Sequence, residues 1–148
     1  MILRKAEPKD KQLFLTMADE FYHLPAVLHE VDPSYFASTF HCIMHGSPYA
    51  ALYIAEENET PVGYLLLSLT WSNEAGGLTV WLEEIYIREA FRQNGYGTQM
   101  LHFVKETYPD AKRFRLEISP ENERAKKLYQ THGFTVLDYQ QMVCEESL

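Results

Sequence analysis

Cysteine is scarce in this sequence, and its histidines follow no HExxH metal-binding pattern. Among 148 residues there are two cysteines, Cys42 and Cys144, which lie far apart and show no metal-like spacing. This usage indicates reduced thiols rather than a disulfide framework or a zinc site. None of the six histidines lies in an HExxH motif. We therefore expect no metal.

Long apolar runs, linker-like stretches and repeats are missing as well. No apolar stretch is long enough to cross a bilayer, which excludes a membrane-spanning protein of the usual helical kind. The start, MILRKAEPKDK, carries charges where a signal peptide has its apolar stretch, so we expect a cytoplasmic protein. A length of 148 residues suits one domain, residues 1–148, with a core of its own.

Positive charge is in short supply. Lysine and arginine number 13 against 21 aspartates and glutamates, which gives a net charge of −8 at pH 7. Such a field repels nucleic acid and anionic membranes and favours cationic partners, so we expect no nucleic-acid or membrane partner. A negative charge also serves solubility alone, and it does not forbid a local anion site.

The apolar pattern predicts one mixed α/β domain. Strands are expected at residues 2–6, 49–56, 62–71, 78–87, 114–119 and 134–144. Helices are expected at residues 10–24, 33–46, 95–108 and 120–133. The polar turn ENETP joins the second and third strands into a hairpin. The chain end, DYQQMVCEE, could pair across a homodimer.

The stretch RQNGYG, residues 92–97, lies where a strand passes into a helix. The first amides of a helix have no intrahelical partners and sit at the positive end of its dipole, and glycine lets a phosphate approach closely. The residues expected to offer amides or charge to an anion are Arg92, Gln93, Asn94, Gly95, Tyr96, Gly97 and Thr98. A glycine-rich loop is also often only a turn.

Two commoner phosphate motifs do not fit this stretch. A P-loop needs a lysine after its last glycine, whereas Gly97 is followed by Thr98. A dinucleotide fingerprint needs a third glycine where Met100 stands. The loop is therefore a candidate anion site of another kind.

A second motif lies downstream, in NERAKKLYQTHGF, residues 122–134. Asn122, Ala125 and Tyr129 fall on nearly one helical face. Together with LEEIYI, RQNGYG and the opening ILRKAEPKD, this stretch resembles the GCN5-related N-acetyltransferase (GNAT) family along essentially the whole chain. The resemblance implies a mixed, mostly antiparallel, twisted sheet, split near its middle, with helices on both faces. It also implies acetyl transfer from acetyl-CoA to a primary amine.

The resemblance assigns the coenzyme-binding residues. The loop 92–98 would bind the pyrophosphate of acetyl-CoA through its amides. Backbone groups of Ile85, Tyr86 and Ile87 would meet the pantetheine arm, because their strand splays from its neighbour there. Asn122 would hold the pantetheine or adenosine side. Lys126 could reach a coenzyme phosphate, as could Arg124 or Lys127, although a solvated basic helix face explains the latter two equally well.

The chemistry needs a proton acceptor and a proton donor. An ammonium ion has no lone pair, so the acceptor amine must lose a proton, to a carboxylate or through water, before it attacks the thioester. Glu83 and Glu84 are candidates, but neighbours on a strand face opposite ways unless a bulge intervenes. WLEEIYI is similar to a stretch of diamine and glucosamine-phosphate acetyltransferases in which the first acid is implicated, which favours Glu83. Tyr129 would face the thioester sulfur and protonate the leaving thiolate.

The same residues also have purely structural interpretations. Both glutamates could be solvated strand residues, and Tyr129 could be a core aromatic. His23 and His29, in FYHLPAVLHEVDP, could contact substrate or simply be exposed.

Acidic residues near the presumed acceptor mouth favour a small cationic amine, polyamine-like or aminoglycoside-like. They are Glu20, Glu30, Asp32, Glu83 and Glu84. A lysine side chain or a peptide N-terminus fits too, and a non-catalytic CoA-binding module or a dimerisation scaffold is the alternative.

Overall fold

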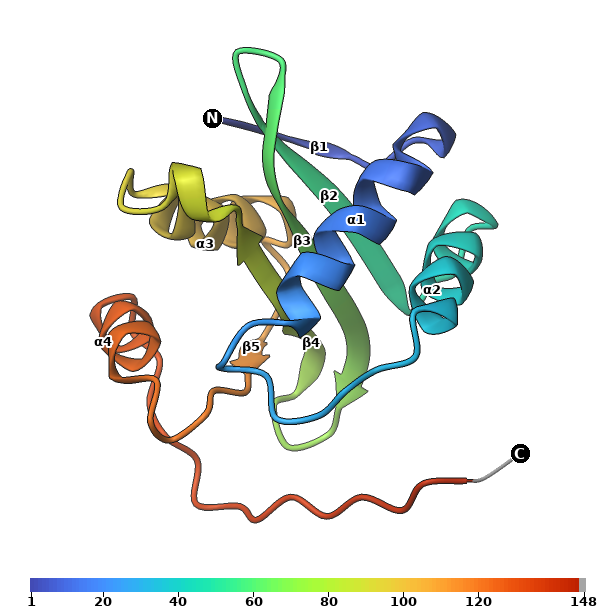
Figure 1. The fold of residues 1–148 in the computed structure, drawn as a ribbon. Coiled ribbons are helices and arrows are strands. Elements are labelled where there is room, and N and C mark those ends of the chain that lie inside the picture. Colours follow the sequence, from blue (N-terminus) through green and yellow to red (C-terminus); the bar gives the residue numbers. More distant parts are fainter. Residues whose placement is uncertain (147–148) are drawn as a thin grey trace.

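The computed structural model describes residues 1–146, which form one sheet with helices on both sides (Figure 1). The strands are β1 (Ile2–Lys5), β2 (Ala50–Glu57), β3 (Thr60–Ser72), β4 (Gly77–Ile87) and β5 (Arg113–Leu116). The helices are α1 (Lys11–Tyr22), α2 (Ser34–Met44), α3 (Tyr96–Thr107) and α4 (Glu123–Thr131), with short 3₁₀ turns at Pro8–Asp10 and Glu89–Phe91. Within residues 1–146, no helix is long and apolar enough to cross a membrane.

The sheet is mixed and mostly antiparallel, as the sequence predicts. Its strands follow chain order, β1-β2-β3-β4-β5; the first three pairings are antiparallel and only β4 and β5 run parallel. The predicted hairpin is β2–β3. Its tip holds Asn58 and Glu59 at φ 48° and 63°, the left-handed conformation that tight hairpin turns require.

Helices cover both faces, because the sheet has an apolar surface on each side. On one face, α1 and α2 bring Phe14 and Phe40 against Tyr64 of β3. On the other, α3 places Leu101 and Val104 against the alternate residues of β3 and β4. Figure 1 shows α1 and α2 together on one side of the sheet and α3 on the other. Burial on both faces explains the nearly continuous apolar run VGYLLL of β3.

The sheet opens between β4 and β5. Strand β5 pairs with only the first part of β4, Thr79 to Leu82. The rest of β4, residues 83–87, keeps its antiparallel partner β3 but has no strand on its other side. The predicted split is therefore present, and it lies beside the last strand because no strand follows β5 within residues 1–146.

The strand expected at residues 134–144 is wrong. After α4 the amide of Phe134 donates to the carbonyl of Tyr129 (3.0 Å), and residues 134–146 then form no helix or strand. This part of the chain runs outside the layered body (Figure 1). Its composition suits a strand, but a strand exists only where a neighbour supplies hydrogen bonds, and within residues 1–146 no strand forms a ladder with it. For the same reason β5 ends at Leu116, earlier than the predicted 119.

Candidate active site

A cavity of about 460 Å³ and another of about 640 Å³ flank α4. The larger lies where the sheet opens, between the end of β4, the start of α3, α4 and the loop after α1. Predicted residues on its wall are Ile85, Tyr86, Ile87, Arg92, Gln93, Gly95, Tyr96, Gly97, Thr98, Asn122 and Tyr129. Further wall residues are Leu24, Pro25, Ala26, Phe91, Ser119, Glu121, Arg124, Ala125 and Leu128. We call this space the cleft. Two motifs far apart in the sequence thus meet in one place.

The loop before α3 presents a row of unpaired amides to the cleft. Gln93 and Gly95 adopt positive φ values, 66° and 74°, which turn the chain sharply into the helix. The carbonyl of Gly95 accepts the amide of Gln99 (3.1 Å), whereas within residues 1–146 the amides of residues 93–98 have no acceptor. Free amides at a helix N-terminus favour an anion. Phosphate binding by this loop stays a prediction.

The two glycines of the loop serve different purposes. Gly95 needs its left-handed φ, and a Cβ built on it would meet nothing within 4 Å, so its surroundings are open. A Cβ on Gly97 would lie 3.2 Å from Cδ2 of Leu128, so this glycine lets α3 and α4 approach each other. Arg92 is held by a bond from its Nε to the carbonyl of Ile87 (3.0 Å). The Asn94 amide donates to the Phe91 carbonyl (2.9 Å) and is not on the cleft wall.

The far wall of the cleft combines a free strand edge with the start of α4. Ile85 and Ile87 pair with β3 on one side only, so their other peptide groups face the opening of the sheet. Asn122 caps α4: its Oδ1 accepts the amide of Ala125 (3.1 Å), which leaves its amino group available. Asn122 therefore caps α4 whether or not it also contacts a ligand.

Tyr129 stands between the two cavities and lines both. Its ring packs edge-on against Phe134, with centroids 5.7 Å apart. Within residues 1–146 its hydroxyl has no hydrogen-bond partner. Burial raises the pKa of this phenol, so it stays protonated and can donate.

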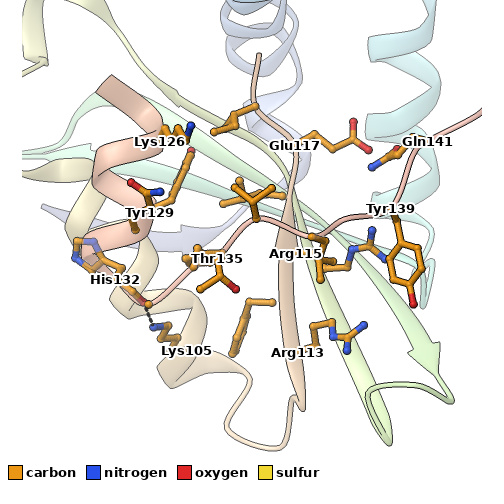
Figure 2. A pocket seen from close by; sticks show the side chains of 18 residues that line it. Lys105, Arg113, Arg115, Glu117, Lys126, Tyr129, His132, Thr135, Tyr139 and Gln141 are labelled. Atoms are coloured by element: carbon orange, nitrogen blue, oxygen red, sulfur yellow. Dashed lines mark hydrogen bonds between the residues drawn. The ribbon is translucent and has the colours of Figure 1, made fainter. Parts of the chain in front are cut away.

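Lys126 lies on the wall of the smaller cavity, not of the cleft (Figure 2). Arg124, which the sequence left as a solvated residue or a phosphate ligand, lines the cleft instead. Of the basic residues on α4, Arg124 is therefore the better placed to meet a phosphate in the cleft.

A β-bulge on β4 brings both glutamates to one face of the sheet. Glu84 pairs with Leu66 and Leu82 with Leu67, which leaves Glu83 without a partner on β3. The Ser68 hydroxyl donates to Glu83 (2.6 Å). Ser68 and Leu66 lie on the face of β3 that α1 covers. Tyr64, which binds Glu84, lies on the same face. The bulge that is needed to place two adjacent acidic side chains on one face of the sheet is therefore present.

Glu84 is clamped by two tyrosines. Tyr22 of α1 donates to its Oε1 and Tyr64 of β3 to its Oε2, both at 2.5 Å, and the side chain is 8% exposed. Burial raises the pKa of Glu84; the two donors oppose this, and the charge of Glu83 adds to it. Burial also raises the pKa of Tyr22 and Tyr64, so both remain donors.

The two tyrosines were not anticipated from the sequence. They lie 62 and 20 residues from Glu84, and no motif links them to it. The available signal is Tyr64, a hydroxyl-bearing residue within the otherwise apolar run VGYLLL. Neither Glu83 nor Glu84 lines the cleft itself; they precede Ile85, the first β4 residue on its wall.

Glu20, another acid of the presumed acceptor mouth, already has hydrogen-bond partners. Tyr86 donates to Oε2 of Glu20 (2.8 Å), and Arg88 donates to both carboxylate oxygens (3.2 Å each). Burial, followed by the contact with Glu20, raises the pKa of Tyr86 to about 12. The charge of Glu20 is thus balanced by Arg88. It offers less attraction to a cation than the sequence suggested.

The remaining predicted residues lie outside the cleft. Asp32 accepts the amide of Ser34 (2.9 Å) at the start of α2, and this bond lowers its pKa. His23 and His29 are exposed and absent from the cleft wall, although Leu24 to Ala26 of the same loop are on it. Within residues 1–146, no group of three His, Cys, Asp or Glu side chains could hold a metal ion.

Comparison with known proteins identifies the family. The model of the acetyltransferase (GNAT) family matches residues 14–134, most of the chain. The chain therefore belongs to this family, as its two motifs predict, and membership implies acetyl-CoA as acyl donor.

One curated relative is the thialysine N-epsilon-acetyltransferase of Sus scrofa. It is 32% identical over 72 residues, which cover 47% of this chain and 40% of the relative. The chain thus aligns with about two fifths of that relative's length.

Solved structures share the fold. AAC(6')-Iy, in complex with the bisubstrate analogue CoA-S-monomethyl-acetylneamine, superposes with a TM-score of 0.79 at 18% identity over 99% of this chain and 98% of its own. A predicted acetyltransferase from Clostridium acetobutylicum, solved with acetyl-CoA, gives a TM-score of 0.78 at 18% identity over 97% and 95% of the two chains. The predicted fold is confirmed.

Proposed function

We propose that the protein transfers the acetyl group of acetyl-CoA to the primary amine of a small cationic metabolite. The observation that carries the proposal is the cleft, where the unpaired amides of residues 93–98, the free edge of β4 and the hydroxyl of Tyr129 meet in one space. Family membership supports the reaction, and the chemistry of these groups supports their roles.

The residues present fit the coenzyme. A diphosphate would be held by the amides of residues 93–98, with the guanidinium of Arg92 and that of Arg124 beside it. The pantetheine arm has amide-like groups that match the free edge of β4 at Ile85 and Ile87, where the carbonyl of Ile87 already accepts a bond from Arg92. When bound, acetyl-CoA supplies the thioester carbonyl that the amine attacks.

Tyr129 is proposed as the proton donor. A departing thiolate needs a proton, and a phenol whose pKa is raised by burial is protonated at neutral pH. Because its hydroxyl has no partner within residues 1–146, it is free to reach the sulfur.

Glu83 is proposed as the proton acceptor and Glu84 as a positioning residue. Both oxygens of Glu84 are occupied by tyrosine hydroxyls and the side chain is buried, so an acceptor amine cannot reach it. Glu83 is exposed and accepts a single bond, from Ser68, on Oε1. It can take a proton from the amine directly or through water.

The acceptor is proposed to be a small cation. The net charge of −8 favours a cationic partner. A relative named for thialysine and a fold neighbour bound to an acetylneamine analogue both concern small amines, which supports this class without naming the substrate.

An amine panel tests the proposal. Purified protein is mixed with acetyl-CoA and one amine at a time: thialysine, a linear diamine, an aminoglycoside or a lysine-containing peptide. Free thiol is then measured. We expect at least one small cationic amine to raise the rate about tenfold or more above the amine-free background.

Two results would contradict it. Tight acetyl-CoA binding in calorimetry, with no thiol release for any amine, indicates a non-catalytic coenzyme-binding module. Turnover with the peptide alone assigns the reaction to protein acceptors.

A further inference from the structure

The end of α1 is hydrogen-bonded to β4 at two places. Tyr22, the last residue of α1, donates to Oε1 of Glu84 (2.5 Å). Glu20, two residues earlier, accepts a bond from the hydroxyl of Tyr86 (2.8 Å). Glu84 and Tyr86 belong to the part of β4 that extends beyond β5. The last turn of α1 is therefore held against the stretch of β4 where the sheet opens.

Tyr22 also contacts α2. Its ring stacks on the ring of Phe36, with centroids 5.2 Å apart and planes at 19°. Phe36 lies in the first turn of α2, which follows residues 23–33. These residues join α1 to α2, contain no helix or strand, and are called the α1–α2 loop from here on (Figure 1). One side chain at the start of this loop thus contacts both β4 and the helix in which the loop ends.

The α1–α2 loop carries the position of Tyr22 into the cleft. The amide of Leu24 donates to the carbonyl of Phe21 (3.0 Å), and the amide of Val27 donates to the carbonyl of Leu24 (3.0 Å). These two tight turns hold residues 24–26 close to the end of α1. Residues 24–26 line the cleft that Ile85 also lines, and we call them the loop wall. A displacement of the end of α1 would therefore move the loop wall with it.

Glu84, the partner of Tyr22, directly follows Glu83, the proposed proton acceptor. The bulge places both glutamates on the face of the sheet that α1 covers. Burial raises the pKa of Tyr22, and the charges of Glu84 and Glu83 raise it further, which places Tyr22 near both carboxylates. Both oxygens of Glu84 are bonded and its side chain is buried, so its position is fixed. The bond from Tyr22 to Glu84 thus connects the loop wall with the strand that carries Glu83.

We propose that Tyr22 is a positioning residue for the acceptor amine: its bond to Glu84 sets the distance between the loop wall and Glu83. The inference rests on the proposed function, because it concerns where the acceptor lies relative to the proton acceptor. A hydroxyl 2.5 Å from a carboxylate oxygen makes a strong bond that fixes direction as well as separation. Without it, the ring still packs on Phe36, but the end of α1 has lost one of its two polar contacts with β4.

The experiment compares Tyr22→Phe with Tyr64→Phe in steady-state kinetics. Each variant removes one of the two hydroxyls that donate to Glu84, but only Tyr22 belongs to α1. For Tyr22→Phe we expect the KM of the acceptor amine to rise about fivefold or more. The kcat and the KM of acetyl-CoA should change less than about twofold, because the loop wall binds the acceptor and not the reacting atoms. Tyr64→Phe should raise the KM of the acceptor less than Tyr22→Phe does.

Tyr53→Phe controls for the loss of a hydrogen-bonded hydroxyl elsewhere. Tyr53 is buried on the opposite face of the sheet, bonds the hydroxyl of Tyr108 (3.1 Å), and is not among the residues lining the cleft. This variant should lose stability in urea unfolding while both KM values stay unchanged. Circular dichroism checks that all three variants are folded.

Amide hydrogen exchange tests the same contact without turnover. Exchange at residues 24–27 should be faster in Tyr22→Phe than in the wild type, and unchanged in Tyr64→Phe. If the wild type acetylates no amine, the proposed function fails, and the exchange rates alone then decide the role of the Tyr22 bond. Unchanged exchange in Tyr22→Phe would overturn that role. So would an unchanged KM for the acceptor, or an equal rise in Tyr22→Phe and Tyr64→Phe, which would assign the effect to the charge of Glu84.

Discussion

Tyr129 is a residue whose chemical role can be separated from its packing. Tyr129→Phe keeps the ring that packs against Phe134 and removes only a hydroxyl that has no partner within residues 1–146. Folding and coenzyme affinity should therefore persist. We expect turnover to fall by ~10²-fold or more, the usual effect of losing a general acid. Steady-state kinetics and calorimetry measure the two quantities.

The pH–rate profile gives the control. The basic limb should lie above the ordinary range of a tyrosine, because burial raises the pKa of Tyr129, and it should flatten in Tyr129→Phe. Glu83→Gln should instead damage the acidic limb, and an acceptor amine of lower pKa should partly rescue it. Near wild-type turnover in Tyr129→Phe would show that Tyr129 contributes packing and no proton transfer.

Glu84 should make stability depend on pH. Its pKa is raised in the folded protein, so its favourable contribution is complete below the ordinary glutamate pKa and is lost as pH rises through the raised value. The unfolding free energy of the wild type should therefore fall relative to that of Glu84→Gln above about pH 4.5. Urea unfolding at several pH values measures the difference. A constant difference across pH would contradict the assignment.

At the residue scale, local motifs were predictable and long-range partners were not. The loop 92–98 and the pair Asn122 and Tyr129 could be picked out from short spacings in the sequence. Helix geometry fixes which residues at such spacings share a face. The clamp on Glu84 joins Tyr22 of α1 to Tyr64 of β3, and such a contact exists only after the sheet has formed. The bulge at Glu83 likewise depends on pairing with β3 rather than on local sequence.

Among the elements, the N-terminus of α3 gives the sharpest test. Gly95→Val forces a β-branched side chain into φ 74° and directs it into open space where a phosphate would lie. Affinity for acetyl-CoA should fall about tenfold or more, because both the turn and the approach are disturbed. Isothermal titration calorimetry measures the affinity.

Gly46→Val is the matched control. Gly46 has φ 80° and likewise nothing within 4 Å, but it follows α2, and it is not among the residues lining the cleft. Both variants should lose a similar ~1–2 kcal/mol of stability from the backbone strain. Only Gly95→Val should weaken coenzyme binding. Equal coenzyme affinity in the two folded variants would remove the phosphate role from the loop.

Elements with their own periodicity were predictable, and those that depend on a neighbour were less so. The apolar stripes of α1 and α3 and the polar turn of the β2–β3 hairpin are local signals, and these elements formed as expected. Residues 134–144 have equally good strand composition but join no strand of the sheet within residues 1–146. Composition therefore predicts a capacity to pair, and topology decides whether pairing occurs.

For the whole molecule, net charge predicts how salt acts. With a net charge of −8, a dicationic acceptor is attracted more strongly than a monocationic one, and salt screens that attraction. Raising ionic strength should increase KM for the dication more than for the monocation, with kcat little changed. Initial rates at several salt concentrations test this. Identical salt responses would favour an apolar or anionic acceptor.

The opening of the sheet between β4 and β5 bears on how this protein can evolve. Where β4 extends beyond β5, residues 85–87 line the cleft, and the peptide groups on that free edge are chemically the same whatever side chains these residues carry. Mutations there can accumulate without erasing that wall, provided the strand itself survives. The loop after α1 has no such protection, because Leu24, Pro25 and Ala26 line the cleft from a turn and offer no strand edge. Changes in that loop can thus reshape one wall of the cleft while the peptide wall along β4 is inherited almost unchanged.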